Sequence, residues 1–462
     1  MQYVSTRGAA PVLDFAGVVV SGPAADGGLY VPRAWPRLSE AELRALQGAS
    51  YGEIARRVML PFVGDSLDEA ALADLIAEAY AGFDHAAVAP LRQLDPATWL
   101  LELFHGPTLA FKDCALQVLA RLLEHFLERG RRRLTVVAAT SGDTGSAAIE
   151  ACRERAGIDI FVLHPKGRVS EVQRRQMTTV TSRNVHNIAI EGTFDDCQAL
   201  VKRLFADAGF REELALGAVN SINWARIVAQ IVYYVAAALA LGAPARRVAF
   251  SVPTGNFGDV YAGYGAARLG LPVGRLVVAT NSNDILARFF EGGDYAPSEA
   301  VATMSPSMDI QVASNFERLL FDLFDGDGAA VARHMRALAD AGSFSVAGAR
   351  IAEKAGLFAA RRVDEEATLA AIRETRARAG IVVDPHTAVG IAAGRAAAPA
   401  DGVPLVCLAT AHPAKFPEAI ERALQSPPPG DPRIAALFGR EERYEVLAND
   451  AEIVKGYMRD RL

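Results

Sequence analysis

The chain has 462 residues, of which 51% are hydrophobic and 22% are charged, and its net charge is −6 at pH 7. This length and composition are typical of a globular protein with two or three domains and a large core. The mildly acidic balance argues against nucleic acid or an anionic membrane as the main partner.

Residues 1–95 are expected to form an accessory domain of mostly short helices. Ser39 precedes an acidic first turn, which is the pattern of a helix N-cap. The segment 67–80 carries apolar residues at helical spacing. Two short apolar stretches, 18–20 and 29–31, predict a small sheet.

From about residue 97 onward, β-rich runs alternate with helical runs. The predicted strands are 99–103, 134–138, 159–163, 185–190, 248–252, 276–280, 381–383 and 405–409. Residues 328–380 are expected to be rich in helix. Strands that alternate with helices predict the α/β class with parallel sheets.

Four scattered cysteines show neither a Cys-x-x-Cys pair nor a His/Cys cluster at metal-ligand spacing. They are Cys114, Cys152, Cys197 and Cys407. We therefore expect reduced thiols, no bound metal and a cytoplasmic protein without a signal peptide. The most apolar segment, 227–243, is short for a bilayer span of about 20 residues, so a buried helix is predicted there and no membrane contact.

One lysine has unusually apolar neighbours. Lys112 follows Leu109, Ala110 and Phe111 in the run 105–113. Burial beside such groups lowers the pKa of a lysine from about 10.4, and an amine with a lowered pKa forms a Schiff base with a carbonyl compound. The alternative is an ordinary lysine whose stem packs on apolar groups while its charged end stays in water.

Two loops downstream have the character of anion-binding turns. Runs 139–145 and 252–259 each lead from a β-rich stretch into a helix start, where backbone N–H groups face the positive helix end. Gly255 and Gly258 would let the backbone approach an anion closely. Either loop alone is explained by the dihedral needs of a turn. Both loops together with a reactive lysine predict pyridoxal 5'-phosphate as the cofactor.

Further segments complete a pattern that runs from end to end of the chain. They are 3–8, 25–32, 164–170, 220–226, 304–310, 384–388 and 410–416. With the lysine run and the two glycine loops, and in this order, they resemble the threonine synthase family. That family belongs to the tryptophan-synthase-β-like group of pyridoxal-phosphate enzymes.

The resemblance implies a fold-type II architecture, with two parallel-sheet lobes flanking a cofactor cleft and an N-terminal accessory domain. Residues 96–462 would form the catalytic region. Its small lobe would span about 115–215, and its large lobe would combine 96–114 with 216–462. The sequence does not distinguish a monomer from a homodimer.

The resemblance also implies the cofactor contacts. Lys112 would carry the cofactor, and the loop Gly255, Asn256, Phe257, Gly258 and Asp259 would hold its phosphate. Thr410 would face the pyridine nitrogen, and the alternative is that its hydroxyl only caps the following turn. His105 and His386 could contact the site, but each is equally explained as a structural, hydrogen-bonded histidine.

Substrate contacts follow from the same resemblance. The turn Ser141, Gly142, Asp143 and Thr144 would receive the substrate carboxylate. A phosphorylated substrate needs a second anion site, for which Arg226 with Asn220 and Ser221 is the first candidate, because arginine binds phosphate through a planar fork. Lys166 is a further candidate, and the alternative for it is a solvated basic loop.

The implied activity is conversion of O-phospho-L-homoserine and water into L-threonine and phosphate, a β,γ-replacement that ends threonine biosynthesis. The alternative enzyme is a threonine-synthase-like phospho-lyase, which would release a keto acid, ammonia and phosphate. A third reading is a non-catalytic scaffold, and the intact Lys112 and both anion loops argue against it.

Overall fold

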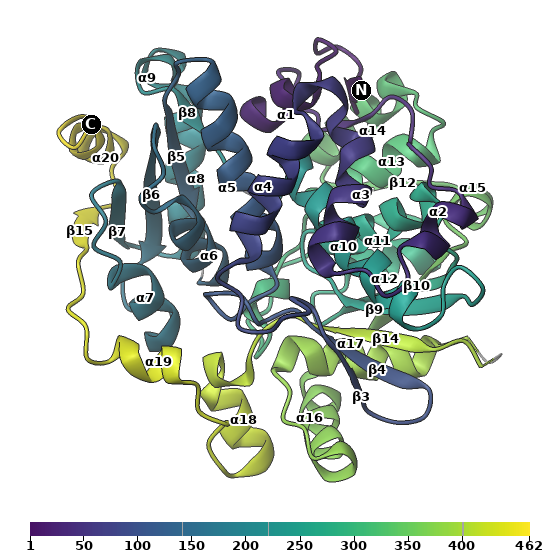
Figure 1. Cartoon of the computed structure of the whole chain (residues 1–462). Coiled ribbons are helices and arrows are strands. Elements are labelled where there is room, and N and C mark those ends of the chain that lie inside the picture. The colour runs from purple at the N-terminus through teal and green to yellow at the C-terminus, as the bar shows by residue number, and fades with distance from the viewer. Residues whose placement is uncertain (141, 220, 400–401) are drawn as a thin grey trace.

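The computed structural model describes residues 1–140, 142–219, 221–399 and 402–462. Within them the chain forms two parallel sheets, each covered by helices, with a helical N-terminal region packed against both (Figure 1). The predicted α/β class with two parallel-sheet lobes and an N-terminal domain is confirmed. Ser141 and Asn220, both predicted to bind substrate, lie outside the described residues.

The large sheet has the strand order β13-β10-β9-β14-β4-β3. Its strands are β3 (Leu91–Gln93), β4 (Thr98–Glu102), β9 (Val248–Pro253), β10 (Val273–Thr280), β13 (Phe358–Arg362) and β14 (Leu405–Ala409). All neighbours pair in parallel except β3 and β4, which pair antiparallel. Every residue of β9 and β14 is buried, as expected for central parallel strands covered on both faces.

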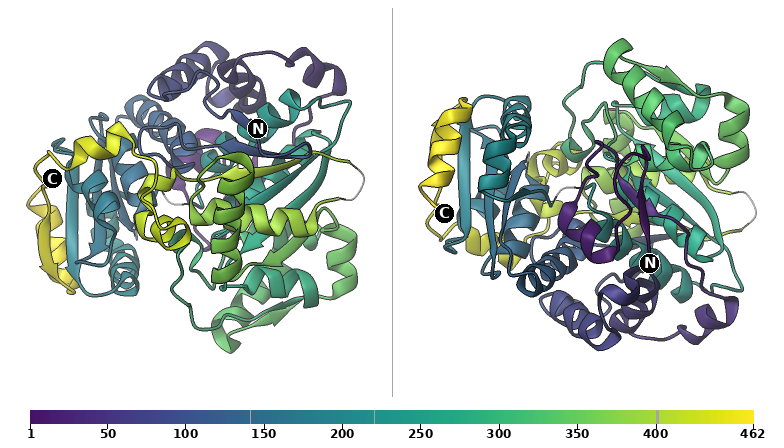
Figure 2. Two further views of the ribbon diagram at one scale, coloured as in Figure 1. Left: turned by 90° about the horizontal axis from the view of Figure 1, so that it is seen from below. Right: turned by 90° about the horizontal axis from the view of Figure 1, so that it is seen from above.

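The small sheet has the order β15-β7-β6-β5-β8, and all of its strands are parallel. They are β5 (Leu134–Ala139), β6 (Ile158–Pro165), β7 (Val185–Glu191), β8 (Leu216–Gly217) and β15 (Glu445–Ala448). Figure 2 shows the yellow C-terminal segment running along this sheet in both views. The segment thus joins the small lobe, whereas the sequence assigned all of 216–462 to the large lobe. The sequence of a short edge strand such as β15 does not show which sheet it joins, because its partner β7 lies more than 200 residues earlier.

The N-terminal region contains one sheet of two short strands. β1 (Tyr3–Ser5) pairs antiparallel with β2 (Tyr30–Pro32). The predicted strand at 18–20 is wrong, because these residues belong to helix α1 (Phe15–Ser21). Phe15, Val18 and Val19 are buried at i, i+3 and i+4 spacing, so a short valine run here fills one helix face.

The remaining N-terminal helices agree with their sequence signals. α2 (Glu40–Ala45) begins at Ser39 with a capping box formed with Glu42, as predicted. α3 (Tyr51–Val63) and the short 3₁₀ helix η1 (Gly64–Ser66) follow. The helix predicted at 67–80 is confirmed as α4 (Glu69–Tyr80).

All predicted strands of the catalytic region but one are present. The exception is 381–383, which connects α16 (Glu365–Ala379) to α17 (Pro385–Ala397) without pairing to a strand. The structure adds β13 inside the segment that was expected to be helix-rich. Strand β13 pairs with β10 and so extends the large sheet at its edge.

A central helix connects the parts of the molecule. α10 (Trp224–Ala240) is buried along almost its whole length, which confirms the buried helix predicted in this apolar region. It contacts α3, α11 (Gly258–Leu269) and α5 (Lys112–Arg129). In the part of the chain that the structure describes, no helix has the length and apolar character needed to cross a bilayer.

The remaining elements complete the two lobes. The helices are α6 (Asp143–Cys152), α7 (Glu171–Thr178), α8 (Phe194–Ala206), α9 (Ala208–Glu213), α12 (Ile285–Gly292), α13 (Phe316–Leu323), α14 (Gly328–Ala341), α15 (Gly348–Lys354), α18 (Pro417–Leu424), α19 (Pro432–Leu437) and α20 (Ala451–Arg459). The 3₁₀ helices are η2 (Pro306–Met308) and η3 (Pro413–Lys415), and β11 (Asp294–Tyr295) pairs with β12 (Phe344–Ser345).

Four of the segments that the sequence analysis singled out follow the carboxyl end of a parallel strand. The lysine loop follows β4, the start of α6 follows β5, the start of α11 follows β9, and Thr410 follows β14. Ligands of open parallel sheets bind outside these strand ends. The topology therefore directs four chemically marked segments toward a common region.

Candidate active site

Lys112 is the first residue of α5, and its side chain is only 9% exposed. Burial lowers the pKa of its ammonium below the ordinary lysine value. The Asp143 carboxylate, 3.6 Å from Nζ, opposes this effect, while the cationic Lys415 and Arg226 add to it. The amine therefore has the burial and the lowered pKa that Schiff-base chemistry requires.

The loop before Lys112 is fixed on two sides. Asp113 accepts hydrogen bonds from the amide and the hydroxyl of Thr108 at 2.8 and 2.7 Å. The amide of Phe111 donates to the carbonyl of Thr410 at 2.8 Å. Leu109 takes a positive φ of 62°, which lets the chain turn into α5. These bonds orient the lysine relative to the loop that follows β14.

Helix α11 begins with an open end. Phe257 adopts the left-handed conformation (φ 63°) at the N-cap and gives no side-chain cap to the helix. Among the described residues, nothing accepts from the amides of 255–257. Gly255 lies so close to η2 that a Cβ there would be 2.6 Å from the Ser307 carbonyl oxygen. The loop thus presents unpaired amides at the positive end of a helix dipole, which is the arrangement that binds phosphate.

Asp259, in the first turn of α11, is held by two phenols. Tyr233 and Tyr234 donate to its Oδ1 at 2.5 and 2.8 Å, and its Oδ2 has no partner in the described part of the chain. Burial raises the pKa of this carboxyl to about 6, against the effect of both hydroxyls.

Helix α6 also begins without a side-chain cap. Gly142 stands at its N-cap with φ 150°, and a Cβ there would lie 2.4 Å from the Gln173 side chain. Thr140 Oγ1 accepts from the amides of Gly142 and Gly145. No acceptor is found within the described ranges for the amides of Asp143 and Thr144. These two amides form a second anion-ready helix start.

The Asp143 side chain is enclosed by cations. Its Oδ1 lies 2.7 Å from Lys415 Nζ and accepts from Gln173 Nε2 at 2.8 Å, while Oδ2 faces Lys112. Burial opposes ionisation, but Lys415 and Lys112 outweigh it and hold the pKa of Asp143 well below its usual range. The sequence analysis did not assign Lys415 to the site. Its inclusion in the matched segment 410–416 was the only available signal.

Arg226 is buried in the first turn of α10. Its Nη1 donates to the Val219 carbonyl at 3.3 Å, and its Nε has no partner in the ranges that the structure describes. Burial lowers the pKa of the guanidinium to about 10. Among the described residues it forms no ion pair, so an enclosed cation remains available for an anionic ligand.

Lys166 is placed differently. Its side chain is 53% exposed and pairs with Glu191 at 3.2 Å, at the end of β6.

Ser221 accepts from Asn315 Nδ2 through its carbonyl at 3.1 Å, and the same amide donates to the Asn256 carbonyl. Asn315 therefore ties the segment before α10 to the loop before α11, a role that the sequence analysis missed.

Thr410 is buried, and its hydroxyl forms no hydrogen bond within the described ranges, so it is free to bind a ligand.

The two histidines that the sequence placed near the site, His386 and His105, have structural partners. His386 Nδ1 lies 2.8 Å from Asp384, and its Nε2 accepts from the Ser307 amide. His105 lies between Asp84 and Glu102.

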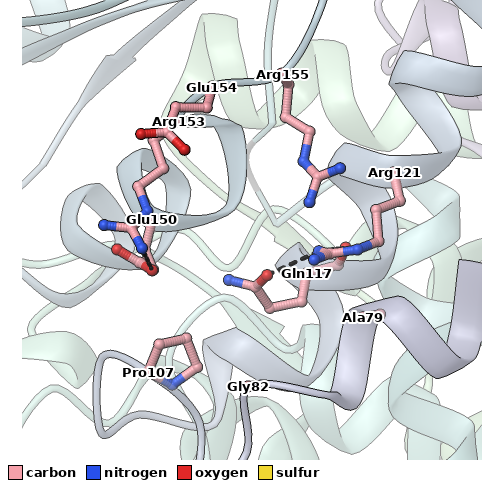
Figure 3. Close-up of a pocket in the computed structure, with 9 residues that line it drawn as sticks. All are labelled: Ala79, Gly82, Pro107, Gln117, Arg121, Glu150, Arg153, Glu154 and Arg155. Atoms are coloured by element: carbon pink, nitrogen blue, oxygen red, sulfur yellow. Dashed lines mark hydrogen bonds and ion pairs between the residues drawn. The ribbon is translucent and has the colours of Figure 1, made fainter. Parts of the chain in front are cut away.

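A cavity of about 410 Å³ lies beside the lysine loop, but it is not the site of this chemistry (Figure 3). Its lining consists of Ala79, Gly82, Pro107, Gln117, Arg121, Glu150, Arg153, Glu154 and Arg155. Its arginines are paired: Arg153 lies 3.1 Å from Glu150, and Arg121 and Arg155 lie 3.1 and 2.8 Å from Glu78, which is outside the lining. Lys112 does not line the cavity, and no metal-holding group of three or more His, Cys, Asp or Glu occurs among the described residues.

Three families match successive parts of the chain. They are threonine synthase N terminus over residues 2–80, pyridoxal-phosphate dependent enzyme over 84–349, and threonine synthase, C-terminal over 387–458. A threonine synthase from Pseudomonas aeruginosa is 55% identical over 459 residues, covering 99% of this chain and 98% of the relative.

Solved structures agree with these matches. A pyridoxal-phosphate-bound threonine synthase from Brucella melitensis superposes with a TM-score of 0.97 at 49% identity, covering 100% and 99% of the two chains. Threonine synthase from yeast gives a TM-score of 0.94 at 38% identity, covering 100% and 98%. The buried lysine, the two open helix starts and these full-length matches lead to one conclusion: the chain belongs to the threonine synthase family of pyridoxal-phosphate-dependent lyases.

Proposed function

We propose that this enzyme converts O-phospho-L-homoserine and water into L-threonine and phosphate. The observation that carries the proposal is the placement of Lys112. Its buried amine lies beside one open helix start, and a buried arginine, Arg226, which forms no ion pair within the described part of the chain, lies close enough to lower its pKa. The site thus offers a reactive amine and places for more than one anionic group.

The residues fit pyridoxal 5'-phosphate, which supplies an electron sink when bound. Lys112 would carry the cofactor. The amides of Gly255, Asn256, Phe257 and Gly258, with the backbone of Asp259, would hold its phosphate. The unpaired Thr410 hydroxyl would face the ring nitrogen, and as a neutral group it would not hold that nitrogen protonated as firmly as a carboxylate.

The substrate carboxylate would bind with Ser141, Gly142, Asp143 and Thr144 at the start of α6, where the amides of Asp143 and Thr144 have no acceptor among the described residues. Arg226, with Asn220 and Ser221 from the same segment, would bind the substrate phosphate. The exposed, ion-paired Lys166 is the weaker candidate for this role. Once displaced from the cofactor, the Lys112 amine stays tethered nearby and can move protons at the substrate carbons.

The decisive experiment is product analysis. Purified protein is incubated with pyridoxal phosphate and O-phospho-L-homoserine, and threonine, keto acid, ammonia and phosphate are measured. We expect threonine and phosphate in equal amounts, and no product with Lys112→Ala, because this substitution removes the amine that is proposed to carry the cofactor. Keto acid and ammonia in place of threonine would establish the phospho-lyase alternative, and full activity of Lys112→Ala would refute the site.

The phosphate assignment is tested by comparing Arg226→Met with Lys166→Met. We expect the first variant to raise KM for O-phospho-L-homoserine about 100-fold or more, because a buried charged hydrogen-bonding group is lost. The second should change KM less than about threefold, since exposed ion pairs contribute little. The visible absorbance of the bound cofactor serves as the control. Equal effects of the two substitutions would contradict the assignment.

We infer a cytoplasmic enzyme, because the four cysteines are all unpaired and buried, as expected in a reducing compartment. The choice between a monomer and a homodimer is settled by analytical ultracentrifugation of the purified protein.

A further inference from the structure

A second buried lysine joins three segments of the site. Lys415, the last residue of η3, has a side chain with 0% exposure. Its Nζ donates to the Thr108 carbonyl at 2.8 Å and lies 2.7 Å from Asp143 Oδ1. It therefore connects the lysine loop, the start of α6 and the segment after β14.

The contacts place two lysine nitrogens on one carboxylate. Asp143 Oδ1 contacts Lys415, and Oδ2 lies 3.6 Å from Lys112 Nζ. Fully buried ammonium groups are retained only where an anion and hydrogen bonds compensate them. Lys415 has the shorter contact with Asp143 and an additional acceptor, so Asp143 mainly compensates Lys415. Lys112 then has only a longer, shared contact to stabilise a proton on its own nitrogen.

The other charged groups around Lys112 do not change this balance. Arg226 on α10 is a further cation, and Asp259 on α11 has a carboxyl whose pKa is raised to about 6 by burial. Burial likewise raises the pKa of Asp113, which lies on α5 near Lys415, to about 6. Around Lys112, Asp143 is thus the carboxylate that stays firmly ionised.

We propose that Lys415 is a positioning residue that occupies the Asp143 carboxylate and thereby keeps the Lys112 nitrogen unprotonated and nucleophilic. The inference rests on the proposed role of Lys112 as the carrier of the cofactor, and it is independent of the proposed substrate. A neutral residue at position 415 would leave Asp143 to Lys112 alone. The Lys112–Asp143 pair would then take up its proton at a higher pH.

The test is a pH titration of the visible absorbance of the purified holoenzyme, with no substrate present. Lys415→Met and Lys415→Gln remove the charge, and Gln keeps a donor for the Thr108 carbonyl. Lys415→Arg keeps the charge and is the matched control. We expect both neutral variants to move the titration midpoint upward by about one pH unit or more, and the arginine variant to stay within about 0.3 unit of the wild type.

A second readout is the rate at which the protein, stripped of cofactor, takes up pyridoxal phosphate at neutral pH. An upward shift of one unit leaves about tenfold less unprotonated amine, so uptake should slow about tenfold in the neutral variants and recover in Lys415→Arg. A merely structural role would lower the melting temperature without moving the midpoint. An unchanged or lowered midpoint in a folded neutral variant, including the absence of any titration in all proteins, would overturn the inference. If Lys415→Met does not fold, Lys415→Gln decides.

Discussion

Helices α6 and α11 each carry an aspartate in the first turn, and both carboxyl groups interact electrostatically with Lys112, yet their pKa values are shifted in opposite directions. Asp143 on α6 contacts two lysines, which hold its pKa well below the usual range. Asp259 on α11 accepts from two tyrosine hydroxyls, and burial raises its pKa to about 6.

The difference shows that burial alone does not decide the direction in which the pKa of a carboxyl group shifts. Both side chains are buried, and the deciding factor is whether their partners are cations or neutral hydroxyls. The consequence differs for each helix start. The α6 start carries a carboxylate that its lysine neighbours hold ionised. The α11 start carries a carboxyl group that loses its charge already near pH 6, and among the described residues its loop amides stay free for a phosphate dianion.

The largest expected effect is a difference in the free energy of unfolding between variants of the two aspartates. Asp143→Asn leaves the fully buried Lys415 ammonium group without its anion, so we expect a loss of about 3–5 kcal/mol in the free energy of unfolding at neutral pH. Asp259→Asn keeps an acceptor oxygen for the tyrosines and should cost about 1 kcal/mol or less. Urea unfolding of both variants measures the difference, and equal losses would break the comparison.

The next effect concerns pH. The folded pKa of Asp259, about 6, exceeds its reference value of 3.8. Its contribution to stability is therefore fully present below pH 3.8 and is lost as pH rises through about 6, a change of roughly 3 kcal/mol. Asp143 has the opposite sign, because its lowered pKa gives stability above its unfolded pKa that is lost as pH falls.

The measurement is the free energy of unfolding across this window for the wild type and Asp259→Asn, without added cofactor. The wild type should lose stability relative to the variant as pH rises, and parallel curves would show that the carboxyl of Asp259 titrates normally.

The smallest effect tests the open end of α11. Asn256→Asp is isosteric and places a carboxylate beside the unpaired amides. We expect about tenfold weaker binding of pyridoxal phosphate, an effect limited by solvent screening because Asn256 is exposed. Asn256→Ser is the matched neutral control in a cofactor titration, and it should bind within about threefold of the wild type. An equal loss in both variants would mean that the side-chain amide, and not the helix end, matters.

Much of the fold could be predicted because buried parallel strands are locally apolar and β-branched. The runs that became β5, β9 and β14 are such strands. The predictions were wrong where the local sequence pattern does not match the position that the segment takes in the folded chain. Strand β13 ends in Arg361 and Arg362, which is unusual for a buried sheet, and it is explained by its position at the edge. Residues 381–383 are apolar because they pack in the core beneath α17, without pairing.

The site could be predicted only where the motif itself carries the chemistry. Lys112 and the loop 255–258 were visible because a lysine among apolar residues and glycines before a helix are local signals. Lys415, Asn315 and Gln173 were not assigned, because their meaning depends on partners far away in the chain. Lys415 contacts Asp143, and Asn315 bridges the segments before α10 and α11.

The pairing of β15 with β7 has a practical consequence for anyone who dissects this protein. The chain leaves the small lobe after β8, builds most of the large lobe, and then returns to add its last strand, β15, to the small sheet. The small lobe is therefore not one continuous stretch of sequence. An expression fragment that stops before residue 445 would leave the backbone N–H and C=O groups at the edge of β7 unpaired, and such an edge can pair with another chain and aggregate.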